Sequence, residues 1–308
     1  MRIAIAGAGT MGRSMAQIFA SFGYNTVLYN RRQPSLDKAQ EFIRQSLETM
    51  AEAGELKEGI EEIISRIAFT TSKDCFADAD FIIENIAEDL DIKKAFFAEI
   101  SEIANPQAVI ATNTSGLSIN AMAEVTKLPE RFIGMHWFNP PHMVLLVEII
   151  RGDATNDTSA QAIHDLCVSI GRKPVIVNKD LPGFAANRIQ IAMLREALDL
   201  VQRGVVTPEG IDDIMKYGLG FRLACAGPLQ IADLGGLDVW YHVCDYLCKD
   251  ICSSREAPAL LREHAEKGEL GVKTGRGFYD YSGDKAAVAI KERDRKMLAV
   301  FEALYKDK

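Results

Sequence analysis

The stretch Arg2-Ile-Ala-Ile-Ala6-Gly7-Ala-Gly9-Thr-Met-Gly12 decides the fold of this 308-residue chain. Its first five residues predict a short buried strand, and residues 13–22 predict a helix. In the GxGxxG motif between them, the first glycine makes the turn, the second lets the backbone approach a pyrophosphate, and the third packs the helix on the strand. Free N–H groups at the helix start bind the anion. The sequence therefore predicts a dinucleotide site formed by Gly7, Gly9, Thr10, Met11 and Gly12.

The residues after the second predicted strand, 25–29, bear on the choice of dinucleotide. A carboxylate normally binds the ribose 2′-hydroxyl here, but this chain has Asn30 followed by Arg31 and Arg32. A carboxylate would repel a 2′-phosphate, whereas these donors would bind it. We therefore expect NADP(H) to be favoured over NAD(H), through Asn30 and Arg31. Alternatively, the arginines are a solvated basic pair at a strand end.

An acidic helical hairpin is predicted after this strand, with helices over residues 34–50 and 56–66. Between Glu48 and Glu62 it carries six glutamates and the single Lys57. Either these glutamates oppose an anionic ligand, or they face water and leave Lys57 and Arg44 free to bind phosphates.

Further buried strands are predicted over residues 81–85 and 109–112. Asn113-Thr-Ser115 then leaves the sheet at the carboxyl end of a strand, where open α/β sheets place their ligands. Ser118 precedes a helical run and is explained as an N-cap. Ser115 has no such local role, so it is the better candidate for a substrate contact.

The segment 133–150, IGMHWFNPPHMVLLVEII, predicts the reaction centre. Two strands, one ending at His136 and one over 144–150, flank a turn stiffened by two prolines. If these strands are neighbours, His136 and Glu148 lie close together. A carboxylate in an apolar run needs a partner, and a histidine held by a carboxylate transfers protons near neutral pH. The alternative is a structural histidine with an unrelated glutamate.

The second half of the chain is predicted to be a separate helical domain. A strand over 174–178 is followed by a break at 179–183, which divides the chain into 1–181 and 182–308. Helices are predicted over 184–202, 208–218, 228–252, 258–267 and 284–305. In the first of them, residues 191, 194, 198 and 201 predict a core face. Apolar runs at 223–226 and 239–241 predict a homodimer interface.

Composition excludes several classes of protein. A formal charge of −8 and a pI near 5.3 argue against nucleic-acid and anionic-membrane partners. No apolar run reaches the roughly 18–20 residues that span a bilayer, and no signal sequence precedes the first strand, so we expect a cytoplasmic protein. The six cysteines form no CxxC pair, so no metal site is expected. Cys244, Cys248 and Cys252 recur every fourth residue, which predicts buried apolar side chains rather than a thiol-lined metal or redox site.

With these segments placed, the chain resembles the 3-hydroxyacyl-CoA dehydrogenase family over nearly its whole length. The motifs that carry the resemblance are GAGTMG (7–12), ENIAEDLDIK (84–93), NTSGLSI (113–119), HWFNP (136–140), LVEII (146–150), PGFAANR (182–188), GPLQIADLGGLD (227–238) and KTGRGFYDY (273–281). The resemblance implies an α/β Rossmann-type domain with an inserted helical hairpin, then an all-α domain that usually dimerises. It also implies hydride transfer between a nicotinamide and the 3-hydroxyl or 3-keto carbon of an acyl thioester.

The resemblance also assigns roles to residues. It gives proton transfer to His136 and its orientation to Glu148, while Ser115 and Asn187 would hold the substrate oxygens. Three further residues, Glu88, Lys93 and Asn113, would lie on the cofactor side.

Three features separate this chain from most of that family. Asn30 replaces the family's usual Asp. Relatives carry lysines on the hairpin that contact the CoA phosphates, and here the hairpin is acidic. The segments GFRLACAG (220–227) and HWFNPPH (136–142) look more like side branches that oxidise free hydroxy compounds. A short-chain 3-hydroxyacyl-CoA is the expected substrate, with a free 3-hydroxy acid or related hydroxy compound as the alternative. The complete reaction-centre set argues against a non-catalytic NAD(P)-binding protein.

Overall fold

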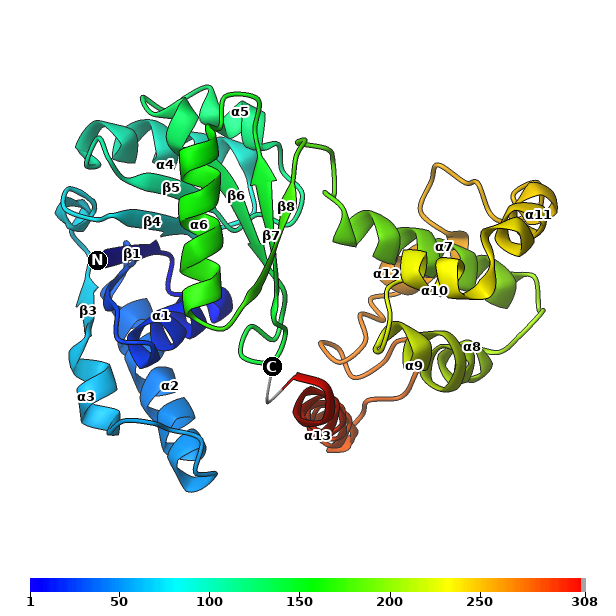
Figure 1. Ribbon diagram of the computed structural model, residues 1–308. Helices are drawn as coiled ribbons and strands as arrows, with labels where there is room; N and C mark the ends of the chain where they lie inside the picture. The colour runs from blue at the N-terminus through cyan, green and yellow to red at the C-terminus, as the bar shows by residue number, and fades with distance from the viewer. Residues whose placement is uncertain (306–308) are drawn as a thin grey trace. The chain divides into compact units, whose positions relative to one another are not determined.

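The structure is a computed structural model that describes residues 1–305 (Figure 1). The chain divides into two compact units between Asn187 and Arg188. The first unit is an α/β domain of Rossmann type. Among the described residues of the second unit, helices are the main elements and no strand is formed. The predicted fold class is therefore confirmed.

A single eight-stranded sheet forms the centre of the first unit, with strand order β3-β2-β1-β4-β5-β6-β7-β8. Neighbouring strands are parallel except β6 and β7, which are antiparallel. The strands are β1 (Arg2–Ala6), β2 (Asn25–Tyr29), β3 (Ile67–Thr70), β4 (Phe81–Glu84), β5 (Val109–Thr112), β6 (Phe132–Trp137), β7 (Leu146–Arg151) and β8 (Lys173–Val177). The sequence analysis missed β3, a four-residue edge strand in which only Ile67 is buried.

Helices cover both faces of this sheet (Figure 1). One face packs against α1 (Thr10–Ser21), α2 (Gln33–Glu52), α3 (Ile60–Ser65) and α6 (Asp157–Ser169), and the other against α4 (Leu90–Ile103) and α5 (Ile119–Ala123). Successive side chains of a strand point to opposite faces of the sheet, so the strands also divide the core into two layers. In β1, Ile3 and Ile5 pack on the face covered by α1, whereas Ala4 and Ala6 pack on the face covered by α4. Two short 3-10 turns, η1 (Lys73–Phe76) and η2 (Pro129–Arg131), complete the unit.

The inserted hairpin is present as α2 and α3. Its second helix begins at Ile60, so the prediction that it starts at residue 56 was wrong. Residues 53–59, which contain Gly54 and Gly59, form the connection instead.

The second unit contains more and shorter helices than the sequence predicted. They are α7 (Ala186–Gln202, which begins at the end of the first unit), α8 (Pro208–Ile214), the π-helical η3 (Met215–Leu219), α9 (Gly220–Leu223), α10 (Pro228–Gly235), α11 (Leu237–Leu247), α12 (Ala259–Glu266) and α13 (Lys285–Tyr305). The single helix predicted over 228–252 is broken at Gly236, whose φ of +92° lies outside helical space. Within residues 1–305, no helix combines the length and apolarity needed to cross a membrane.

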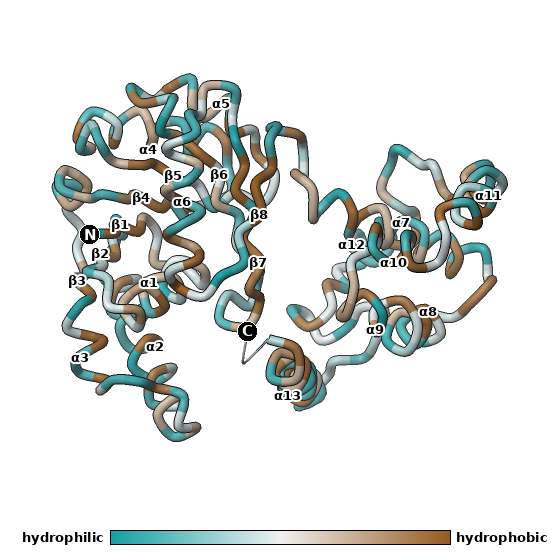
Figure 2. Tube along the Cα trace, viewed as in Figure 1, coloured by the Kyte–Doolittle hydropathy of each residue, from teal (hydrophilic) through white to brown (hydrophobic). Residues whose placement is uncertain are grey.

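The apolar side chains of the second unit are mostly exposed. Among described residues 188–305, Leu198 alone is buried, and Ile191 on the predicted core face is 59% exposed. The prediction of buried cysteines was also wrong for Cys244 and Cys248, which are exposed, and α11 ends before Cys252. Figure 2 shows hydrophobic segments on the helices of this unit as well as in the sheet. A single copy of the chain therefore gives this unit almost no core.

Candidate active site

The glycine turn between β1 and α1 is closed towards the sheet and open on its outer side. Gly7 has a φ of +106°, and a Cβ added there would lie 2.4 Å from the backbone oxygen of Asn85. A Cβ on Gly12 would lie 1.8 Å from the backbone oxygen of Gly7, whereas one on Gly9 would meet nothing within 4 Å. Helix α1 begins without a side-chain cap. The residues present thus leave open backbone and uncapped N–H groups where a pyrophosphate would bind.

Alanine substitutions should separate the roles of these glycines. Gly9→Ala should leave the melting temperature unchanged but weaken NAD(P)H binding by roughly tenfold or more, about 1.4 kcal/mol, because its methyl group enters the ligand side of the turn. Gly12→Ala should instead cost about 1–3 kcal/mol of folding free energy, because its methyl group meets backbone. Thermal unfolding and titration of nicotinamide fluorescence measure the two effects. Equal loss of stability in both variants would contradict this assignment.

His136 and Glu148 form a buried hydrogen-bonded pair. They are directly opposite each other in the antiparallel ladder of β6 and β7, as the sequence predicted if these strands were neighbours. Nδ1 of His136 lies 2.9 Å from Oε2 of Glu148. The side chains are only 4% and 2% exposed.

The other carboxylate oxygen of Glu148 is held by the N-terminus of α7. The backbone N–H groups of Ala185 and Ala186 donate to Oε1 at 3.1 and 2.9 Å. Burial alone would raise the pKa of Glu148, but the hydrogen bonds from His136 and these two N–H groups hold it below its usual value. Phe184, with a φ of +52°, makes the turn into this helix, so the prediction that the helix starts there was wrong. Its buried ring packs edge-on against His136 at 5.7 Å between centroids.

This arrangement would allow His136 to act as a base. An ionised Glu148 favours a proton on Nδ1, which leaves Nε2 of the neutral imidazole free to accept one. When that proton arrives, the carboxylate stabilises the imidazolium.

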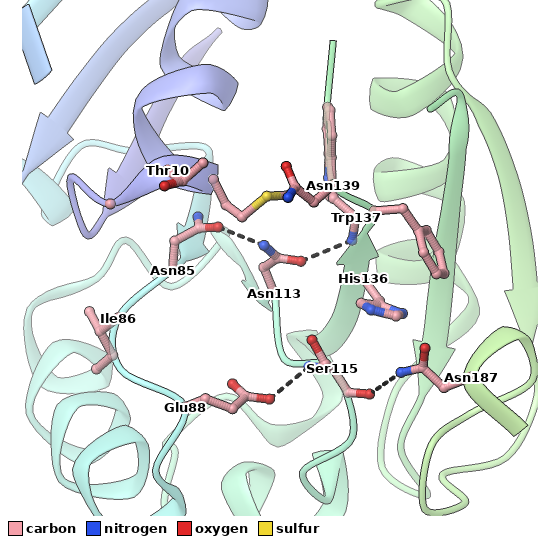
Figure 3. A pocket seen from close by; sticks show the side chains of 13 residues that line it. Thr10, Asn85, Ile86, Glu88, Asn113, Ser115, His136, Trp137, Asn139 and Asn187 are labelled. Carbon is pink, nitrogen blue, oxygen red and sulfur yellow. Dashed lines mark hydrogen bonds between the residues drawn. The ribbon is translucent and has the colours of Figure 1, made fainter. Parts of the chain in front are cut away.

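A cavity of about 460 Å³ adjoins the pair at the carboxyl ends of β1, β4, β5 and β6 (Figure 3). It is lined by eight predicted site residues, namely Gly9, Thr10, Met11, Glu88, Asn113, Ser115, His136 and Asn187, together with Asn85, Ile86, Trp137, Phe138 and Asn139. The sequence analysis assigned no site role to the last five residues. Each of them follows a strand end or ends a strand, and that position was the available signal.

Polar contacts link the walls of this cavity (Figure 3). The side chain of Asn113 donates to Oδ1 of Asn85 and accepts from the backbone N–H of Trp137, at 2.8 and 2.9 Å. The amide of Asn187 donates to the backbone oxygen of Ser115 at 2.7 Å. No hydrogen bond within the described chain uses the Ser115 hydroxyl, so it can serve a ligand.

The six other predicted site residues lie outside the lining. Glu148 lies behind His136, and Asn30 and the exposed Arg31 follow the end of β2. Lys93 was expected to contact the cofactor, but its side chain is fully buried against Glu84 and reaches the cavity only through Glu88. Gly7 and Gly12 form the closed side of the turn.

Comparison with known proteins gives consistent matches along the chain. Residues 2–181 match the NAD binding domain of 3-hydroxyacyl-CoA dehydrogenase, and residues 183–281 match its C-terminal domain. The chain is 39% identical over 282 residues to a probable 3-hydroxybutyryl-CoA dehydrogenase of Deinococcus radiodurans, covering 91% of this chain and 100% of that protein. It is 35% identical over 300 residues to 5-formyl-3-hydroxy-2-methylpyridine 4-carboxylate 5-dehydrogenase of Mesorhizobium japonicum, covering 97% and 96%.

Similar solved structures include a pyridine-carboxylate dehydrogenase and a 3-hydroxybutyryl-CoA dehydrogenase. A crystal structure of an NAD+-dependent 5-formyl-3-hydroxy-2-methylpyridine 4-carboxylic acid 5-dehydrogenase matches with a TM-score of 0.91 and 34% identity, over 99% of this chain and 98% of that one. The (S)-3-hydroxybutyryl-CoA dehydrogenase of Ralstonia eutropha matches with a TM-score of 0.77 and 38% identity, over 92% and 99%.

Proposed function

Because this chain belongs to the 3-hydroxyacyl-CoA dehydrogenase family, we propose that it transfers a hydride between NAD(P) and the 3-hydroxyl or 3-keto carbon of a short-chain 3-hydroxyacyl-CoA. One observation carries the proposal: His136, which Glu148 holds by a hydrogen bond, lies on the wall of a cavity that is also lined by Gly9, Thr10 and Met11 of the glycine turn. A proton acceptor and a dinucleotide-binding turn on one cavity are what oxidation of a hydroxyl requires.

In the proposed reaction, Nε2 of His136 accepts the proton of the substrate's 3-hydroxyl group. At the same time, a hydride leaves the carbon that bears this hydroxyl. A dinucleotide whose pyrophosphate is held by the glycine turn would supply its nicotinamide as the hydride acceptor. Glu148 stabilises the imidazolium, and Ser115 and Asn187 hold the substrate oxygens. In the reverse direction His136 returns the proton to the keto oxygen.

Consumption of NAD(P)H on addition of acetoacetyl-CoA or a β-keto acid tests this function. We expect a fall in absorbance of the reduced nicotinamide with at least one of these substrates. Binding of NAD(P)H without turnover of either kind of substrate would instead favour a non-catalytic binding protein.

A second candidate substrate is a free 3-hydroxy acid or related hydroxy compound without CoA, and the hairpin favours it. Arg44 was a possible phosphate ligand, but its guanidinium binds Glu61 with both terminal nitrogens, at 2.5 and 3.3 Å. Arg66 is similarly engaged by Glu58 and Glu62. Of the cations between residues 44 and 66, only Lys57 makes no ion pair within residues 1–305, so this part of the hairpin offers a CoA diphosphate little positive charge.

Comparing thioesters with a free acid decides between these substrates. We would measure kcat/KM for acetoacetyl-CoA, for its N-acetylcysteamine analogue and for acetoacetate. If CoA is recognised, the full thioester should exceed the truncated one by about tenfold or more, equivalent to one charge-assisted contact. Equal values for the two thioesters, with acetoacetate as good as either, would establish the free-acid alternative.

We also infer that NADP(H) is preferred over NAD(H). Arg31 is exposed directly after β2 and forms no ion pair within the described chain. Arg31→Ala should therefore lower kcat/KM for NADP(H) by roughly tenfold or more, at about 1.5–3 kcal/mol for a charge-assisted contact, and leave NAD(H) unchanged. Arg32→Ala, at the neighbouring N-cap of α2, is the matched control. Wild-type kinetics that are equal or better with NAD(H) would refute the preference.

We propose further that residues 1–181 bind the dinucleotide, and that residues 182–308 complete the substrate site and form a symmetric homodimer. Large apolar side chains in the second unit support the dimer, because Tyr217, Leu229 and Leu234 are each about 80% exposed. A second copy of the same helices is the surface most suited to cover them. Light scattering at micromolar concentration should give twice the chain mass of 34.0 kDa. A single 34.0 kDa species would contradict the dimer.

A further inference from the structure

A buried ion pair lies next to the cavity, between β4 and α4. Glu84 ends β4, Lys93 lies in the first turn of α4, and both side chains are 0% exposed. Nζ of Lys93 lies 2.6 and 2.7 Å from the two carboxylate oxygens of Glu84. The hydroxyl of Thr112 and the backbone N–H of Ile86 also donate to this carboxylate, at 2.6 and 2.5 Å.

Lys93 also faces a second carboxylate, which lines the cavity. Oε2 of Glu88 lies 3.4 Å from Nζ, and the Glu88 side chain is 44% exposed. Its other oxygen, Oε1, accepts hydrogen bonds from the hydroxyl of Thr114 at 2.6 Å and from the backbone N–H of Ser115 at 2.7 Å. The contacts therefore run without interruption from the buried ammonium through Glu88 to the backbone of Ser115. Figure 3 shows the last step, between Glu88 and Ser115.

We propose that Lys93 is a positioning residue, whose charge holds Glu88 against the Thr114–Ser115 turn and so fixes Ser115 at the reacting end of the cavity. This inference rests on the proposed function only in taking Ser115 as a substrate contact. It replaces the direct cofactor contact that the family resemblance implied for Lys93.

The charges explain why a cation is needed at this position. Glu84 and Glu88 are both within ion-pair distance of one ammonium, so without it two like charges would face each other beside a protein interior. Glu84 is enclosed and held by Thr112 and Ile86, so it cannot leave. Glu88 is half-exposed and would turn towards water. The Ser115 N–H would then lose its acceptor.

A neutral replacement of the buried pair tests the role of Lys93 without leaving a buried charge. Glu84→Gln/Lys93→Met removes both charges, and such replacements often fold as well as the ion pair. We expect kcat to fall by roughly tenfold or more, because misplacement of a substrate-holding group is costly. Amide hydrogen exchange of residues 113–118 should become about tenfold faster as the Ser115 N–H loses its partner.

Glu84→Gln alone is the matched control, because it keeps Lys93 opposite Glu88. This variant should retain wild-type kcat and slow exchange at 113–118. If the double variant matches the wild type in kcat and exchange, or if the single variant loses as much as the double, Lys93 has only a structural role. If the double variant does not fold, Glu88→Gln is the second test, because it removes the charge that Lys93 attracts. Faster amide hydrogen exchange of residues 113–118 in this variant would support the proposal, and an unchanged rate would overturn it. The exchange measurement needs no substrate, so it stands even if the proposed reaction is wrong.

Discussion

Replacing His136 by alanine should lower kcat by about 10²–10⁴-fold, the usual contribution of a positioned acid or base. Among the described residues that line the cavity, His136 is the one whose imidazole is held by a buried carboxylate, and we propose that it transfers the proton. Thermal stability and NAD(P)H affinity should change far less, because the glycine turn lies on other elements. Steady-state kinetics, nicotinamide fluorescence and thermal unfolding together measure the three quantities.

Glu148→Gln is the matched variant, because it keeps the size of the side chain and an oxygen for the N–H groups of Ala185 and Ala186. If its amide then donates to Nδ1, the imidazole proton moves to Nε2 and the base is lost. We therefore expect kcat to fall in this variant too. A folded His136→Ala protein with near wild-type kcat would end the assignment of His136 as the base.

Local pattern predicted most of the α/β unit. The glycine turn and the apolar runs gave seven of the eight strands, because buried parallel strands are nearly continuous in hydrophobic residues. The sequence analysis missed β3, where Ala68 is exposed and Phe69 and Thr70 are only half-buried. No hydrophobic run therefore marks this strand. Order within the sheet could not be read from local pattern, because it depends on which strands pair across long connections.

The candidate site was predictable wherever a residue follows the end of a strand. Asn113, Ser115 and His136 come together because the carboxyl ends of β5 and β6 meet at one edge of the sheet. The sequence analysis put Lys93 on the cofactor side, whereas its side chain is buried. The motif that contains Lys93 gives no sign of this burial. Backbone groups such as the N–H of Ala186 escape sequence analysis altogether, since any residue could supply them.

Ion pairing on the hairpin shows a similar limit. The Arg66–Glu62 pair has i,i+4 spacing and could be read from one helix. Arg44 and Glu61 belong to different helices, so their contact depends on how α2 packs against α3. That packing removes Arg44 from the possible phosphate ligands.

Leu229→Asp should destabilise the protein by about 3 kcal/mol or more per protomer if the exposed helical surface is a dimer interface. The melting temperature should then fall by roughly 5–10 °C. Leu229 is 82% exposed in one copy, so an isolated chain would tolerate the change. It also lies in the first turn of α10, where a carboxylate favours the helix by about 0.3–1 kcal/mol. Loss of stability would therefore come from burial against a second copy rather than from the helix.

Val168→Asp is the control for this prediction. Val168 is 52% exposed in the last turn of α6, where a carboxylate is unfavourable to the helix, yet it belongs to the unit with a complete core. Val168→Asp should change the free energy of unfolding by no more than about 1 kcal/mol. Light scattering should show that this variant is still a dimer. If Leu229→Asp were as stable and as dimeric as Val168→Asp, Leu229 would lie outside the interface. If the wild type were also monomeric, the apolar surface of the second unit would need another explanation than a second copy of this chain.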